Sequence, residues 1–224
     1  MLRVAIDGPG GTGKSSIAKA VADLFGIEYI NTGAMYRALG LKSKRLGIDP
    51  ADESAVKAML DDTVIDFAGG CTMLDGEDVS ALLKTNEISM AASNISKLAA
   101  VRAKVDEVSR HLAATRDVVM EGRDIGTTVI PDAEVKIFMT ASLEVRAERR
   151  YKQLIGLGKE ADYEQVLKET AERDYQDSHR ELSPLRQADD AVLLDTSDMT
   201  VEENIDAVAQ IITEKTQRMP VSTM

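Results

Sequence analysis

The sequence predicts an α/β protein built on a five-stranded parallel sheet. Two observations carry this prediction: short apolar segments alternate with longer amphipathic ones, and a glycine-rich loop joins the first apolar segment to the first helical one. The predicted strands are Leu2–Ile6, Glu28–Ile30, Val118–Met120, Val135–Met139 and Val192–Leu194. Short apolar segments of this kind are typical of strands buried on both faces, so we expect helices on both faces of the sheet.

The helical patterns lie between these strands, with one exception. They are Ser15–Phe25, Gly33–Leu46, Leu98–Ala114, Leu143–Ile155, Asp162–Tyr175 and Val201–Thr216. From about residue 63 to residue 93 the pattern changes to short β-like segments, Val64–Phe67 and Thr72–Leu74, with Gly-Gly between them and Asp-Gly after them. These dipeptides favour hairpin turns, so we expect a small inserted β-rich subdomain here rather than a sixth central strand.

Composition limits the classes of function. The chain has 224 residues, and 27 basic against 38 acidic residues give it a net charge of −11. This balance argues against non-specific binding to nucleic acid or to anionic membranes, and an anionic ligand would need locally clustered arginines. Cys71 is the only cysteine, which excludes an intramolecular disulfide. With no signal-peptide pattern and no apolar segment long enough for a membrane helix, we expect a cytoplasmic protein.

The glycine-rich loop is the most informative motif. Gly8-Pro9-Gly10-Gly11-Thr12-Gly13-Lys14-Ser15 fits G-x-x-x-x-G-K-[ST] between a strand and a helix. Glycines let backbone N–H groups line an anion pocket, and the helix adds its positive end. We expect Lys14 to reach the β- and γ-phosphates of ATP and the Ser15 hydroxyl to ligate Mg²⁺. The predicted ATP-binding residues are Gly8, Pro9, Gly10, Gly11, Thr12, Gly13, Lys14, Ser15 and Ser16.

Two further motifs follow predicted strands. Asn31-Thr32-Gly33 precedes a helix whose first turn is expected to hold Tyr36 and Arg37. Glu121 ends the strand Val118–Met120 where a Walker-B-like carboxylate belongs, followed by Arg123 and Asp124. The plain alternatives are a helix cap and a surface ion pair.

A third motif is a set of arginines, Arg146, Arg149 and Arg150. Their spacing predicts that all three lie on one helix face, with a solvated charged face as the alternative. Gly156-Leu157-Gly158 follows, a break suited to a lid that closes and reopens.

Together these motifs resemble the bacterial-type cytidylate kinases, a family of nucleoside monophosphate kinases. The resemblance runs from Ile6 to Asp195, and its most specific parts are Thr32–Arg37 and Gly122-Arg123-Asp124-Ile125-Gly126-Thr127. It implies the P-loop nucleoside-monophosphate-kinase fold in a single domain. The core would be 1–31, 94–141 and 190–218, the monophosphate-binding region 32–93, and the lid about 146–180.

The resemblance also implies roles for individual residues. It implies that Ser93, Arg102 and Asp124 recognise the base and that Arg173 and Asp177 contact the ribose. The full acceptor site implied is Thr32, Tyr36, Arg37, Ser93, Arg102, Arg123, Asp124, Arg173, Asp177 and Arg180. The implied catalytic residues are Lys14, Arg123, Arg146, Arg149, Arg150 and Arg180. This chain departs from the family pattern at Thr32, where Ser is common, and at Glu121, where Asp is frequent.

The activity implied is phosphorylation of CMP and dCMP by ATP with Mg²⁺, in a monomer. One alternative is another small P-loop kinase, acting on UMP, AMP, dTMP or shikimate. A second, from a different class, is a GTPase switch or an ATP-driven regulator. The chain has no Asn-Lys-x-Asp guanine motif, and its arginines exceed what a switch needs. For Asp7 two roles stay open: organising the loop or ordering a metal-bound water.

Overall fold

The computed structural model describes residues 1–221, and residues 222–224 lie outside the described chain. The chain divides into two compact units. The first comprises Glu28–Asp117 with Met1, and the second comprises Leu2–Ile27 and the chain from Val118 onward. No helix in residues 1–221 is both long enough and apolar enough to cross a membrane.

The central sheet confirms the five predicted strands. They are β1 (Arg3–Asp7), β2 (Glu28–Asn31), β6 (Val118–Gly122), β7 (Val135–Thr140) and β8 (Val192–Asp195). Their order is β2-β6-β1-β7-β8, which is the doubly wound arrangement expected. β1 pairs in parallel with both β6 and β7, and β7 pairs in parallel with β8. Because Ile6 lies opposite Glu121, the carboxyl ends of β1 and β6 meet at one edge.

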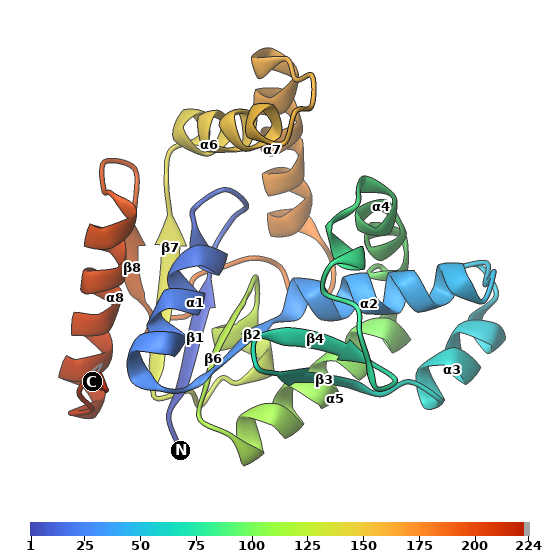
Figure 1. The fold of residues 1–224 in the computed structure, drawn as a ribbon, viewed down its shortest axis with the longest axis horizontal. Coiled ribbons are helices and arrows are strands. Elements are labelled where there is room, and N and C mark those ends of the chain that lie inside the picture. The colour runs from blue at the N-terminus through green and yellow to red at the C-terminus, as the bar shows by residue number, and fades with distance from the viewer. Residues whose placement is uncertain (222–224) are drawn as a thin grey trace. The chain divides into compact units, whose positions relative to one another are not determined.

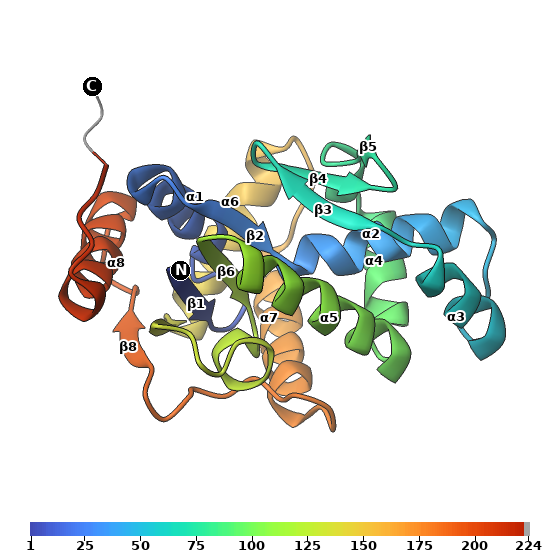
Figure 2. The ribbon, with the colours of Figure 1, turned by 90° about the horizontal axis from the view of Figure 1, so that it is seen from below.

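Two helices of the second unit cover one face of its sheet. α1 (Lys14–Phe25) and α8 (Val201–Thr216) lie side by side in both ribbon views (Figures 1 and 2). α1 buries Ile17 and Val21, and α8 buries Val208 and Ile212, so four apolar side chains face the core. Burial of such side chains supplies about 2 kcal/mol each before entropy is counted.

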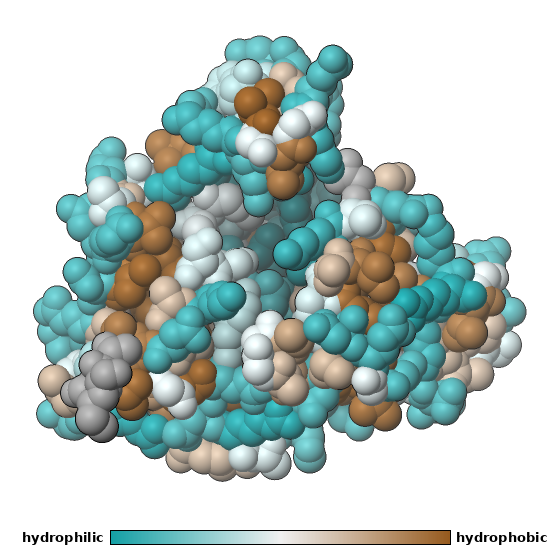
Figure 3. Space-filling model, viewed as in Figure 1, coloured by the Kyte–Doolittle hydropathy of each residue, from teal (hydrophilic) through white to brown (hydrophobic). Residues whose placement is uncertain are grey.

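The other helices of this unit lie beyond the carboxyl end of β7. α6 (Leu143–Gly156) and α7 (Tyr163–His179) pack together at the top of Figure 1, where the rings of Tyr151 and Tyr163 meet edge to face at 6.1 Å. The visible surface of this pair is mostly hydrophilic (Figure 3). A short π-helical turn, η2 (Ile125–Val129), follows β6. Gly156 stays inside α6, and Gly158 follows its end with φ of 71°.

The first unit contains the inserted sheet. β3 (Ile65–Ala68), β4 (Cys71–Leu74) and β5 (Glu77–Asp78) form an antiparallel sheet of three strands, which confirms the predicted hairpins. The turn between β3 and β4 uses Gly69 and Gly70, both with positive φ. The rest of the unit is helical: α2 (Thr32–Arg45), α3 (Glu53–Asp61), η1 (Leu82–Lys84), α4 (Asn86–Ile95) and α5 (Ala99–Thr115).

Two of these helices were not predicted. The expected β-rich stretch was wrong beyond Asp78, because α4 occupies much of its second half. Thr85 caps α4 by accepting the N–H of Ile88, and Ile88, Ala92 and Ile95 bury one face at helical spacing. α3 begins in the same way, with Asp52 accepting the N–H of Ala55. Both helices had sequence signals, namely a capping residue followed by apolar residues three and four apart.

Candidate active site

The glycine-rich loop is held in a conformation that only glycine adopts readily. Gly8, Gly11 and Gly13 have φ values of 146°, 83° and 94°. A Cβ atom at Gly8 would overlap the carbonyl oxygen of Met139 in β7, and one at Gly11 would lie 2.9 Å from Cβ of Arg146 in α6. The loop therefore lies directly against β7 and α6, and its glycines permit that approach.

Lys14 is the buried cation of this loop. Its ammonium donates to the carbonyl oxygen of Pro9 at 2.6 Å and to Oγ1 of Thr12 at 3.2 Å. Burial, with a smaller contribution from Arg123, lowers the Lys14 pKa to about 7. A bound polyphosphate would favour the charged form and draw the ammonium outward. Ser15 and Ser16 are exposed in the first turn of α1, where a metal–nucleotide could reach them.

Asp7 organises the segment that follows β6. Its two carboxylate oxygens accept the N–H groups of Ile125 at 2.8 Å and of Gly126 at 2.7 Å. These contacts order the turn after β6, which is neither of the two roles left open for Asp7. Burial raises the Asp7 pKa from 3.8 to about 6, against the two N–H groups, which lower it.

This raised pKa predicts a pH dependence of stability. Ionised Asp7 is disfavoured in the folded state, so stability falls as pH rises from about 4 to about 6 and is level above that range. Asp7→Asn does not titrate. The unfolding free energy of the wild type minus that of Asp7→Asn should therefore fall by on the order of 3 kcal/mol across this range. Urea unfolding at several pH values measures it, and parallel profiles for the two proteins would contradict it.

Two of the three clustered arginines contact the glycine loop. Arg146 is buried; its Nη1 donates to the carbonyl oxygen of Gly10 at 3.3 Å and lies 2.6 Å from Asp174. Nη1 of Arg149 lies 3.5 Å from the carbonyl oxygen of Thr12, and its guanidinium also bonds Thr196.

Arg150 is placed differently. It is exposed and donates to Gln153 within α6. Residues 146, 149 and 150 span an arc of about 100° around α6, so the three arginines share one broad helix face as predicted, with Arg150 at the edge away from Arg149.

The residues after β6 pair with α7 and the segment that follows it. Nε of Arg123 donates to Asp177 at 2.7 Å, and Arg180 lies 3.2 Å from the buried carboxylate of Asp124. Glu121 is buried at the end of β6. The structure thus brings four of the expected acceptor-site residues into two ion pairs. Arg173 is exposed on α7, and its charge acts on Lys14 by lowering the pKa of that ammonium.

The remaining expected residues lie in the first unit: Thr32, Tyr36, Arg37, Ser93 and Arg102. The guanidinium of Arg102 lies 5.8 Å from the ring centre of Tyr36, a cation–π contact. Ser93 is exposed on α4, and Thr32 is buried at the start of α2. Asn31, not Thr32, caps α2 by accepting the N–H of Ala34 at 2.9 Å. α2 starts at Thr32, so Tyr36 and Arg37 lie in its second turn rather than its first.

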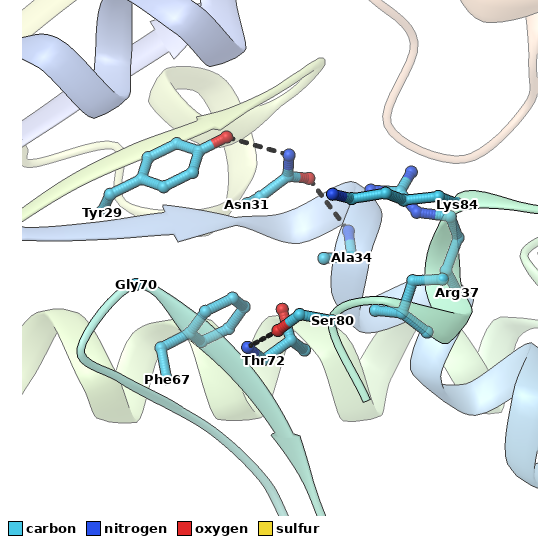
Figure 4. A pocket seen from close by; sticks show the side chains of 10 residues that line it. Tyr29, Asn31, Ala34, Arg37, Phe67, Gly70, Thr72, Ser80 and Lys84 are labelled. Atoms are coloured by element: carbon cyan, nitrogen blue, oxygen red, sulfur yellow. Dashed lines mark hydrogen bonds between the residues drawn. The ribbon is translucent and has the colours of Figure 1, made fainter. Parts of the chain in front are cut away.

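Arg37 lines a pocket of about 140 Å³ that the sequence did not predict (Figure 4). Its walls come from β2, α2, the inserted sheet and η1. The lining residues are Tyr29, Asn31, Ala34, Arg37, Phe67, Gly70, Thr72, Ser80, Leu83 and Lys84. No local motif marks residues such as Lys84, because the pocket forms only when the inserted sheet packs near α2.

Comparison with known proteins gives the family. The family model for cytidylate kinase matches residues 4–214. The cytidylate kinase of Thermosipho melanesiensis is 44% identical over 213 residues, covering 95% of this chain and 97% of its own. That of Mycobacterium avium is 46% identical over 219 residues, covering 96% of each chain.

Solved structures agree on the fold. An uncharacterized protein from Eubacterium ventriosum has a TM-score of 0.55 at 12% identity, covering 95% of this chain and 98% of its own. TT1252 from Thermus thermophilus has a TM-score of 0.51 at 17% identity, covering 96% and 98%. At these identities the likeness concerns the fold alone. The sequence match over nearly the whole length carries the assignment: the chain belongs to the cytidylate kinase family.

Proposed function

We propose that this protein transfers the γ-phosphoryl group of ATP to CMP and dCMP, forming ADP with CDP or dCDP. The observation that carries the proposal is the set of cations around the glycine loop. Lys14 lies inside the loop, and Arg146 and Arg149 reach the carbonyl oxygens of Gly10 and Thr12 from α6. This concentration of charge in a protein of net charge −11 suits a nucleoside triphosphate.

The residues that would bind ATP, the phosphoryl donor, lie in the second unit. Loop N–H groups and Lys14 would hold the β- and γ-phosphates, and Arg146 and Arg149 would neutralise charge that spreads over the transferring group. The exposed Ser15 hydroxyl in the first turn of α1 fits a metal ion carried by ATP. Mg²⁺ bound there would supply charge neutralisation between the β- and γ-phosphates.

The acceptor, CMP or dCMP, must be oriented toward ATP, but its phosphate oxygen does not need a base to remove a proton. The second pKa of a phosphate monoester is about 6, so its oxygen is already anionic near neutral pH and requires no strong base. Arginine suits this task because its planar fork binds phosphate through two hydrogen bonds and keeps its charge. We assign phosphate binding to Arg37, Arg123 and Arg180, ribose contact to Arg173 and Asp177, and base contact to Ser93, Arg102 and Asp124.

Asp124 supports the choice of cytosine over uracil. A carboxylate accepts from the exocyclic amine of cytosine and repels the carbonyl oxygen at the same position of uracil. Asp124→Ala should therefore raise the KM for CMP about tenfold or more and narrow the ratio of kcat/KM between CMP and UMP. Initial rates with both acceptors measure this ratio. An unchanged ratio would remove Asp124 from base selection.

A panel of acceptors separates this proposal from its alternatives. ADP formation from ATP with Mg²⁺ is measured with CMP, dCMP, UMP, AMP and dTMP, and without an acceptor. Fast turnover with CMP and dCMP alone supports the proposal, and turnover with another monophosphate supports a different small kinase. An ATP-driven regulator would hydrolyse ATP at full rate with no acceptor present.

A further inference from the structure

The pocket of the first unit is lined by basic residues without an acidic one. Two of its ten lining residues, Arg37 and Lys84, are basic, and none is acidic. The chain as a whole carries 38 acidic against 27 basic residues, so a wall without a carboxylate departs from its average surface. Two cations facing one cavity repel each other unless an anion lies between them. The lining therefore favours an anionic ligand.

The two cations extend toward one end of the pocket. Nη1 of Arg37 lies near the start of α2, because a Cβ atom at Gly33 would be 3.2 Å from it and 3.0 Å from the side-chain oxygen of Asn31. Lys84 reaches the pocket from the end of η1. In Figure 4 both side chains extend toward the end marked by Asn31 and Ala34. The opposite wall is formed by the buried residues Phe67 and Thr72.

Several other cations of this unit have carboxylate partners. Lys42 pairs with Asp75 at 2.7 Å, and Arg45 pairs with Glu77 at 2.6 Å. For Lys84, no ion pair is found within residues 1–221, and its side chain is exposed. Its ammonium is thus positioned at the pocket without a carboxylate to neutralise it.

We propose that Lys84 is a further substrate-binding residue, which binds the phosphate of the nucleoside monophosphate together with Arg37. The proposal rests on the proposed function, since it assigns this pocket to the acceptor. The planar guanidinium of Arg37 would donate two hydrogen bonds to phosphate oxygens, and the ammonium of Lys84 would add a second positive charge from the inserted segment. The insert would then contribute directly to acceptor binding.

The test compares a ligand that carries phosphate with one that does not. Calorimetric titration measures the affinity of CMP and of cytidine for the wild type, Lys84→Ala, Lys84→Arg and Lys57→Ala. Lys57 is the matched control, because it is exposed on α3 and does not line the pocket. Lys84→Ala should weaken CMP about fivefold to tenfold and leave cytidine unchanged. Lys84→Arg should stay within about twofold of the wild type, as should Lys57→Ala.

Two outcomes would overturn the proposal. The first is an unchanged CMP affinity in Lys84→Ala, and the second is an equal loss for cytidine, which would indicate a structural effect. Wild-type activity with CMP is measured beforehand, so failure of the proposed function is recognised independently of any variant.

Discussion

Replacing Lys14 with methionine is expected to lower kcat/KM for the reaction of ATP with CMP by about a thousandfold or more. Lys14 is the one cation inside the glycine loop, and its ammonium already bonds the loop through Pro9 and Thr12. A bound triphosphate would replace these contacts with charge-assisted bonds that strengthen as charge develops on the transferring group. Methionine keeps the apolar length of the side chain and removes the charge. Steady-state kinetics with varied ATP measures the effect.

The same substitution should not destabilise the fold. Because burial lowers the Lys14 pKa to about 7, folding disfavours the ammonium. This cost is fully present below about pH 7 and fades as pH rises toward the ordinary lysine pKa of about 10.4. Lys14→Met should therefore melt at the same temperature as the wild type or higher at pH 6. Lys19→Met, on the exposed face of α1, should keep normal kinetics. Lys14→Met with full activity would contradict the role given to the loop.

Replacing Gly8 with alanine is expected to destabilise the protein by about 3 kcal/mol or more. The φ of Gly8 is 146°, a value that residues with a side chain rarely adopt, and the added Cβ would overlap the carbonyl oxygen of Met139. Met139 lies in β7, so relief of the overlap would require movement of a central strand. Thermal or urea unfolding measures the loss.

Gly10→Ala is the matched control for Gly8→Ala. Gly10 has no positive φ, and a Cβ atom there would meet Nη2 of Arg123 at 3.7 Å, an ordinary contact. Its stability should stay within about 0.5 kcal/mol of the wild type. Equal stability of the two variants would contradict the claim that the close approach of Gly8 to β7 excludes a side chain at this position.

The features that the sequence predicts correctly are those with a local pattern. The five strands are apolar enough to be recognised singly, and the glycine loop combines spacing with context. The parallel register then brings Glu121 to the same edge as Asp7 and the loop. The predicted β-rich stretch extended the hairpin signals too far and covered α4, although the cap and apolar spacing of α4 are visible in the sequence. The short α3 has the same signals.

Other features depend on contacts across the chain that no local pattern contains. Asp7 accepts N–H groups from residues 125 and 126, and Arg149 bonds Thr196. These pairs form only once β1, β6 and β8 are in register. The position of Lys84 could not be inferred from the sequence, because it depends on how the inserted sheet packs.

Phosphoryl transfer from ATP to CMP is tested most directly by phosphorus NMR of a reaction with the wild-type protein, ATP, CMP and Mg²⁺. We expect ADP and CDP to appear in equal amounts, with no inorganic phosphate beyond that of a protein-free control. The β-phosphorus of CDP should arise only from the γ-phosphorus of ATP. Release of inorganic phosphate without CDP would contradict phosphoryl transfer to CMP and would assign the glycine loop to an ATPase.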